Sequence, residues 1–92
     1  MSLYTIPNAP SSPETRLTTT GWDSIRATFW AQVWEDGKPG STQPVLAWQC
    51  GSRHREVPTV DALQQALAGQ GIALPAGVRT ALSQDQRRDG AQ

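Results

Sequence analysis

The amino-acid sequence predicts an α+β fold, in which a three-stranded antiparallel β-meander is followed by two helices in the order β-β-β-α-α. Residues 24–34 alternate apolar and polar side chains with a period of two, which is typical of a half-buried strand. Two shorter strand-like runs follow, and the last third of the chain repeats apolar residues at helical spacing. We therefore expect one small domain at residues 21–84, a flexible or extended arm at 1–20 and a disordered tail at 85–92.

The composition limits the classes of function. The 92 residues include eight basic and eight acidic side chains, so the formal net charge is zero and gives no overall field toward nucleic acid or an anionic membrane. A single cysteine, Cys50, excludes an intrachain disulfide, and the N-terminal residues show no signal peptide. No apolar run approaches the roughly 18 residues of a membrane span. We expect a cytoplasmic protein that does not enter membranes.

The proposed arm is rich in proline, serine and threonine, and its apolar residues are scattered. Such a composition favours an extended, unpacked segment. Tyr4 and Ile6 could still dock as a short edge strand, and Gly21 would mark the entry to the folded part.

The first predicted strand, about residues 25–35, has two contrasting faces. Its core face would carry Ile25, Ala27, Phe29, Ala31 and Val33, and its second face Arg26, Thr28, Trp30, Gln32 and Trp34. Two tryptophans and an arginine on the second face indicate that something covers or binds that side. A different set also fits helical spacing, with Asp23 or Ser24 as the N-cap, which leaves an α-β-β-α order as the alternative; its apolar residues would be Trp22, Ile25, Phe29, Trp30 and Val33. The strand is favoured because Thr, Phe, Trp and Val are strand-prone.

Residues 45–50 and 53–57 are the second and third predicted strands, joined by a two-residue turn at Gly51 and Ser52. In that register Gln49 pairs with His54 and Cys50 with Arg53. Leu46 would belong to the core side. The run 53–55 (Arg-His-Arg) would not form one basic patch, because consecutive strand residues face opposite ways.

Two helices are predicted after residue 57. Thr59 is a plausible N-cap, Asp61 favours the helix dipole, and Gly69 or Gly71 ends the first helix. Its apolar stripe would be Val60, Leu63, Ala66 and Leu67. A second, shorter helix would start near Leu74 and Pro75, with an apolar face of Val78, Ala81 and Leu82.

The chain offers little for catalysis. Cys50 and His54 are the only residues of their kinds, and the predicted register projects them to opposite faces of the hairpin. A structural zinc site needs four Cys or His ligands, and this chain has two. We therefore expect no catalytic residue, no metal site and no cofactor, and a protein that is not an enzyme.

The second face of the sheet is the predicted partner-binding site. Its candidate residues are Arg26, Trp30, Gln32, Trp34, Gln49 and His54. We expect a non-catalytic binding module of the adaptor or inhibitor type, which acts on a protein partner through this face or through an exposed strand edge. A homodimer along that edge is compatible with the same pattern. Single-stranded nucleic acid, stacked on the tryptophans, is the alternative partner. A third interpretation is that the second helix or the arm covers Trp30 and Trp34 as part of the core.

Overall fold

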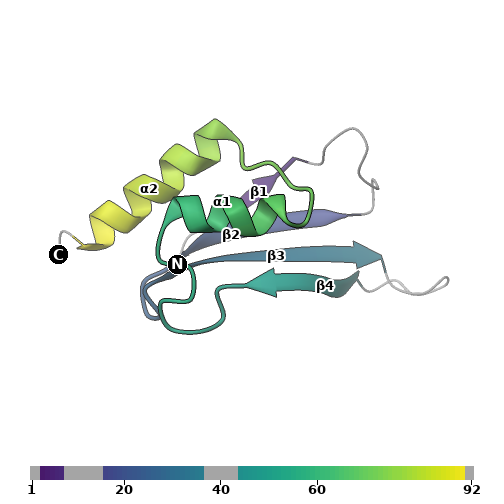
Figure 1. The fold of residues 1–92 in the computed structure, drawn as a ribbon, viewed down its shortest axis with the longest axis horizontal. Coiled ribbons are helices and arrows are strands. Elements are labelled where there is room, and N and C mark those ends of the chain that lie inside the picture. The colour runs from purple at the N-terminus through teal and green to yellow at the C-terminus, as the bar shows by residue number, and fades with distance from the viewer. Residues whose placement is uncertain (1–2, 8–15, 37–43, 91–92) are drawn as a thin grey trace.

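The protein is a four-stranded antiparallel sheet followed by two helices (Figure 1), in a computed structural model that describes residues 3–7, 16–36 and 44–90. Sequential strands are neighbours throughout the sheet, in the order β1-β2-β3-β4. The elements are β1 (Tyr4–Ile6), β2 (Leu17–Asp23), β3 (Thr28–Asp36), β4 (Pro44–Cys50), α1 (Val60–Ala68) and α2 (Ala76–Gly90). The predicted α+β class is confirmed, whereas the predicted number of strands is wrong.

Two strands were not expected: β1 lies within the segment predicted to be an arm, and β2 begins in that segment and continues to Asp23. Thr20 pairs with Tyr4 on one side and with Ala31 on the other, so β2 is a central strand. Thr18, Thr19 and Thr20 of β2 are buried, and the Thr20 hydroxyl donates to the Trp30 carbonyl at 2.7 Å. β-Branched threonine suits a strand interior once its hydroxyl has a partner. The docking of Tyr4 and Ile6 as an edge strand is confirmed.

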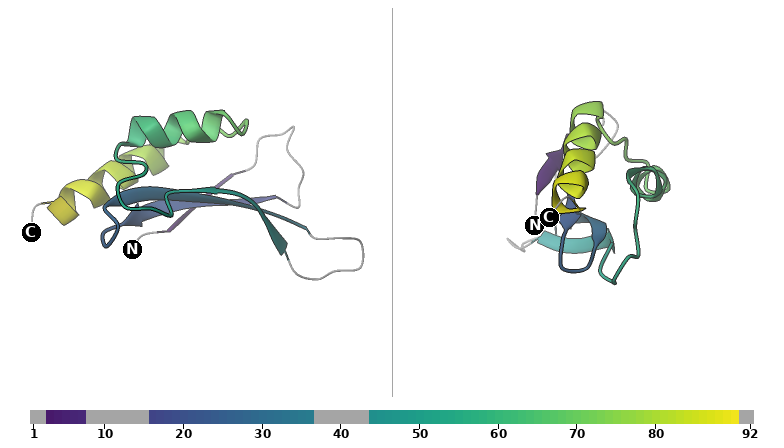
Figure 2. Two further views of the ribbon diagram at one scale, coloured as in Figure 1. Left: turned by 60° about the horizontal axis from the view of Figure 1, so that its bottom comes forward. Right: turned by 90° about the vertical axis from the view of Figure 1, so that its left-hand side faces the viewer.

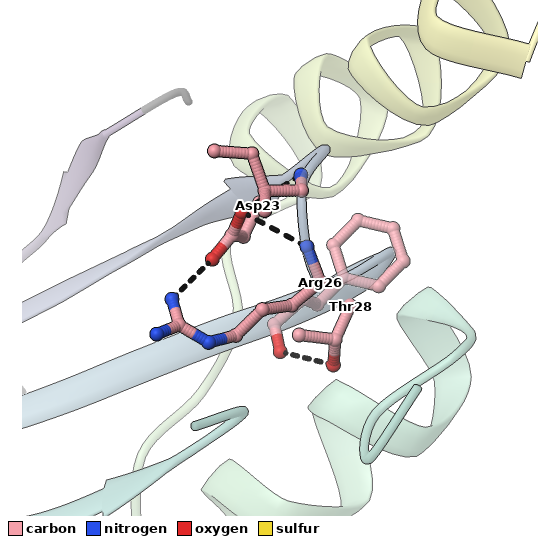
Figure 3. A network of polar contacts seen from close by, with 5 residues as sticks. Asp23, Arg26 and Thr28 are labelled. Atoms are coloured by element: carbon pink, nitrogen blue, oxygen red, sulfur yellow. Dashed lines mark hydrogen bonds and ion pairs between the residues drawn. The ribbon is translucent and has the colours of Figure 1, made fainter. Parts of the chain in front are cut away.

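The strand predicted at residues 25–35 begins three residues later, at Thr28, because residues 24–27 form the β2–β3 turn. Ile25 is 88% exposed and so is not a core residue. The Asp23 carboxylate accepts hydrogen bonds from the backbone N–H groups of Ile25 (3.0 Å) and Arg26 (3.3 Å), which stabilises the turn (Figure 3). The helical alternative is therefore wrong, and Arg26 lies in a turn rather than on a strand.

The third strand predicted at residues 53–57 is wrong, because this segment forms turns and bends across the end of the sheet. Gly51 has a φ of +81°, and a Cβ there would lie 2.0 Å from the Phe29 carbonyl oxygen. The Gly51 N–H donates to the Glu56 carboxylate at 2.7 Å. Val57 then bonds to β3 instead of β4: its N–H donates to the Thr28 hydroxyl, and its carbonyl accepts from the Phe29 N–H.

The first helix follows its prediction closely. The Thr59 hydroxyl accepts a hydrogen bond from the Ala62 N–H at 3.0 Å, which makes Thr59 the N-cap, and Gly69 is the C-cap. Val60, Leu63 and Leu67 are buried against the sheet. The apolar stripe read from the sequence is thus the packed face of α1.

The second helix is longer than predicted and runs through most of the expected tail. Its Leu82 is fully buried, as the apolar spacing indicated. Beyond it, Asp85 accepts a hydrogen bond from the Tyr4 hydroxyl (2.6 Å), and Asp89 accepts one from the Trp22 indole N–H (3.2 Å). These contacts to the sheet stabilise a helical segment whose own sequence is polar.

Both helices lie on the same face of the sheet, and within residues 3–7, 16–36 and 44–90 no helix covers the other face (Figure 2). The helix-covered face holds the core, which includes Trp22, Phe29, Ala31, Leu63 and Leu82. We call the opposite side the open face; the strand register assigns to it Thr5, Leu17, Thr19, Gly21, Trp30, Gln32, Trp34, Leu46 and Gln49. No helix in the described ranges is both long and apolar enough to cross a membrane.

Candidate functional site

The open face carries most of the predicted site. Trp30, Gln32 and Trp34 alternate along β3 with buried residues that face the helices. Both tryptophans are half-buried, and neither belongs to the core beneath the helices. The interpretation that α2 buries Trp30 and Trp34 in the core is therefore wrong, since α2 packs on the opposite side of the sheet.

The neighbours of these residues divide the open face into a polar and an apolar part. Gln49 of β4 lies directly opposite Gln32. Leu17 and Leu46 flank Trp34 from the two neighbouring strands, and Leu17 is 48% exposed. Leu46 was expected on the core side, but an irregularity after Val33 shifts the register of β4 and brings it to the open face.

A hollow of about 350 Å³ lies on the open face near the β2–β3 turn, and we call it the trough. Its lining includes Asp23, Arg26, Trp30, Gln32, Gln49 and Ser52. Leu3, just before β1, also lines it, so the trough crosses the sheet from β1 to β4. The fold thus brings four predicted residues together: Arg26, Trp30, Gln32 and Gln49. Trp34 lies farther along the open face, and His54 is not part of the lining.

Asp23 and Arg26, which both line the trough, form an ion pair with 2.9 Å between the guanidinium nitrogen and the carboxylate oxygen; Figure 3 shows this pair. Burial would raise the pKa of Asp23, but hydrogen bonds from the Arg26 side chain and from two backbone N–H groups outweigh burial and lower it. Asp23 is therefore ionised at neutral pH. The Arg26 side chain is still 54% exposed, so it has further donors to offer a ligand.

The indole N–H of Trp30 is buried and has no hydrogen-bond partner among the described residues. A buried donor without a partner destabilises a fold by about 1–3 kcal/mol. Gly21, which lies opposite Trp30 on β2, has no side chain that could supply an acceptor. A ligand acceptor would remove this unfavourable contribution once the Trp30 side chain has adjusted to bring its buried N–H within reach.

Residues 53–55, which we call the basic turn, adjoin the trough. The Arg55 N–H donates to the Arg26 carbonyl at 3.0 Å, and Ser52 before the turn lines the trough. Arg53, His54 and Arg55 are all exposed. The prediction that His54 lies beside Gln49 on a neighbouring strand is therefore wrong. Because the segment is a turn, its basic side chains do not alternate between two faces as they would on a strand. The Arg-His-Arg run was the sequence feature from which this group of basic residues could have been predicted.

The geometry around Cys50 does not suit a nucleophile. Burial raises the pKa of the Cys50 thiol to about 11, and the nearby Glu56 carboxylate acts in the same direction. A thiol with such a pKa is almost entirely protonated at neutral pH and reacts slowly. Within the described ranges, no group of three or more His, Cys, Asp or Glu side chains is arranged to hold a metal ion.

Comparisons with known proteins do not add to this site, since no protein-family model, no curated protein and no solved structure matches the chain. What the trough binds is therefore inferred from its lining residues and their surroundings.

Proposed function

We propose that this protein is a non-catalytic binding module, of the adaptor or inhibitor type, which contacts a protein partner through the open face. The observation that carries the proposal is that Trp30 and Trp34 stay partly exposed on a sheet face that neither α1 nor α2 covers, and that Arg26 lines the trough together with Trp30. Tryptophan and arginine dominate the energetics of protein interfaces. The protonated state of Cys50 at neutral pH supports the non-catalytic part of the proposal.

The site stands on rigid elements. Phe29 and Ala31, which alternate with Trp30 on β3, are fully buried beneath the helices. A strand anchored in this way holds its outward side chains in place before a partner binds, which lowers the entropic penalty of association.

The edge of β4 extends the same surface. β4 is the last strand of the sheet and carries no charged residue, although charges commonly protect exposed edges from pairing. Val45 is 55% exposed there. A strand of the partner, or of a second copy of this chain, could add to the sheet at this edge.

Site-specific photo-crosslinking in the native host tests the proposal. A photoreactive residue replaces Gln32 on the open face or, as the matched control, the exposed Gln84 on α2. We expect an adduct with one defined protein from position 32 and none from position 84. That protein, once purified, should bind the wild-type chain and lose at least about tenfold in affinity when Trp34 is changed to Ala. Identical adducts from both positions, or unchanged affinity of a folded Trp34→Ala variant, would contradict the proposal.

Single-stranded nucleic acid is the second candidate partner, and the position of the basic turn next to the trough that Trp30 lines favours it. Bases could stack on the indole while phosphates meet Arg53 and Arg55. Titration of tryptophan fluorescence with mixed-sequence single-stranded RNA and DNA, at low and physiological salt, tests this function. Saturable quenching that salt weakens would support it, and no change at either salt would exclude it.

A further inference from the structure

We propose that the trough binds an extended segment of a protein partner that presents a carboxylate at one end and uncharged residues along the rest. The inference rests on the proposed function, because it names the chemistry of the partner at the open face. It follows from the charges of the trough, from the hydrogen-bonding groups of its floor and from the basic turn at its end.

The trough is electrically neutral along its length. Asp23 and Arg26 are its charged lining residues, and they pair with each other at 2.9 Å. Cys50 also lines the trough and is protonated at neutral pH. A charged group placed over this middle region would lose hydration and meet an ion pair whose opposite charges largely offset each other, so the net attraction would be small. The part of the ligand that lies here is therefore uncharged.

The floor of the trough offers groups that suit a peptide backbone. Gln32 and Gln49 lie opposite each other on β3 and β4, and neither side-chain amide has a hydrogen-bond partner among the described residues. Each amide supplies both donors and an acceptor, as a peptide group requires. The buried indole N–H of Trp30 needs one acceptor, such as a carbonyl, once the side chain adjusts toward it.

The span of the trough limits the length of the segment. Four adjacent strands cover about 14 Å, from three spacings of about 4.8 Å each. About four extended residues, at roughly 3.3 Å each, cross that distance. A short linear segment of the partner therefore fills the trough.

The basic turn follows Ser52, which lines the trough, and supplies charge next to that end from outside the lining itself. Arg53 and Arg55 have no acidic partner among the described residues, and the neighbouring Glu56 carboxylate already accepts the Gly51 N–H at 2.7 Å. This end is therefore positive. Arginine pairs with carboxylates through two parallel hydrogen bonds, so an Asp or Glu side chain or a free C-terminus is the matching group.

The charge distribution favours a protein segment over a nucleic acid. Single strands carry one negative charge for every nucleotide, and proteins that bind them without base preference line a groove with positive charge. Here the positive charge is confined to one end, and the middle is neutral. A segment with one terminal carboxylate matches this pattern.

Nuclear magnetic resonance of the isotope-labelled full chain tests the inference, because each tryptophan indole N–H gives its own signal. The probes are the blocked tetrapeptide acetyl-Ala-Asn-Ala-Asp-amide, its analogue ending in Asn-amide, acetyl-Ala-Asn-Ala-Ala with a free C-terminus, and a thymidine tetranucleotide. The Trp34 signal is the internal control, since Trp34 shares the open face but does not line the trough.

We expect the Asp peptide to shift the Trp30 signal saturably and the Trp34 signal little. The Asn analogue should bind roughly tenfold more weakly, and a double variant, Arg53→Gln with Arg55→Gln, should remove that difference. The matched control is Arg87→Gln with Arg88→Gln, two exposed arginines on α2, and it should retain the difference. The peptide with a free C-terminus distinguishes a terminal carboxylate from a side-chain carboxylate as the preferred group.

Three results would overturn the inference: no shift of Trp30 with any peptide, equal binding of the Asp and Asn peptides, or tighter binding of the tetranucleotide. The proposed function can fail separately. If crosslinking at position 32 identifies a partner and no peptide shifts the Trp30 signal, the open face binds protein and the trough inference is wrong. If the Asp peptide binds as expected and no partner is crosslinked, the inference about the trough is supported and the proposed function as a protein-binding module is wrong.

Discussion

The Tyr4 hydroxyl donates a 2.6 Å hydrogen bond to the Asp85 carboxylate and so joins the first strand of the sheet to the last helix. One helical turn later, Asp89 accepts from the Trp22 indole N–H at 3.2 Å. The two acceptors are spaced i, i+4 and so lie on the same side of α2. This pair of contacts, together with the buried Leu82, stabilises α2 on the face of the sheet opposite the open face.

Removing the Tyr4 hydroxyl should lower the free energy of unfolding. We expect Tyr4→Phe to destabilise the protein by about 1–2 kcal/mol, because the hydrogen bond to Asp85 is charge-assisted but only partly buried. Urea unfolding of Tyr4→Phe, Asp85→Asn and the double variant measures the coupling between the two side chains. Strictly additive effects would show that the two groups do not interact in solution.

The same contact predicts a loss of stability at alkaline pH. The hydrogen bond to Asp85, then burial, then the negative charge of Asp85 raise the pKa of Tyr4 above its ordinary value of 10.0. A raised pKa in the folded state means that the stabilisation is complete below the unfolded value and is lost as the pH rises through the folded value. Tyr4 is the only tyrosine, so the ultraviolet absorbance of tyrosinate reports its titration directly. Titration of the folded chain at the value of the unfolded chain would contradict the prediction, and Tyr4→Phe should flatten the alkaline dependence.

Cys50 should react slowly with thiol reagents. Its pKa of about 11 exceeds the ordinary value of 9.0 by two units, so near neutral pH the thiolate fraction falls about a hundredfold. We expect the folded protein to be labelled at least a hundredfold more slowly than the unfolded chain at about pH 8, with the rate rising toward pH 11. Because Cys50 is the only cysteine, the rate at which the protein reacts with a chromogenic thiol reagent is the rate of Cys50 labelling. Equal rates in the folded and unfolded states would restore Cys50 as a candidate nucleophile.

Gly51 should be far less replaceable than Gly71, although both have a positive φ (+81° and +73°). A Cβ at Gly51 would lie 2.0 Å from the Phe29 carbonyl oxygen, whereas nothing lies within 4 Å of a Cβ at Gly71. Gly71→Ala should therefore destabilise by about 1 kcal/mol through its backbone conformation alone. Gly51→Ala should destabilise by more than about 3 kcal/mol, because backbone must also move. Thermal unfolding of both variants makes the comparison, and similar midpoints would mean that the segment after β4 packs differently.

Local patterns in the sequence predicted the elements whose formation depends on local chemistry. The alternation from Thr28 onward predicted β3 and the composition of its two faces, and Thr59 predicted the start of α1. The errors occur where distant contacts decide the structure. β2 is a strand because it pairs with β1 and β3 and the Thr20 hydroxyl finds a partner across the sheet. α2 continues to Gly90 because Asp85 and Asp89 meet the aromatic residues of β1 and β2.

The site was predictable to the same extent. Trp30 and Gln32 follow from the period of β3, and Gln49 follows from the pairing of β3 with β4. The place of Asp23 in the wall of the trough could not be predicted, because it depends on the β2 strand that the sequence did not reveal. The basic turn was missed for a related reason, since a strand was expected where the chain crosses the end of the sheet.

The unpaired indole N–H of Trp30 should make this tryptophan tolerant of replacement by phenylalanine. Trp30→Phe removes a buried donor that has no partner among the described residues, which offsets the loss of ring area, so we expect the free energy of unfolding to change by less than about 1 kcal/mol. Trp22→Phe is the matched control, because its indole N–H donates to Asp89 at 3.2 Å and its ring contacts Phe29 in the core. Trp22→Phe should lower the free energy of unfolding by about 2 kcal/mol or more. Denaturant unfolding of the two variants decides the matter: an equal loss would mean that the Trp30 N–H is paired in solution, and the trough would then have one donor fewer to offer a ligand.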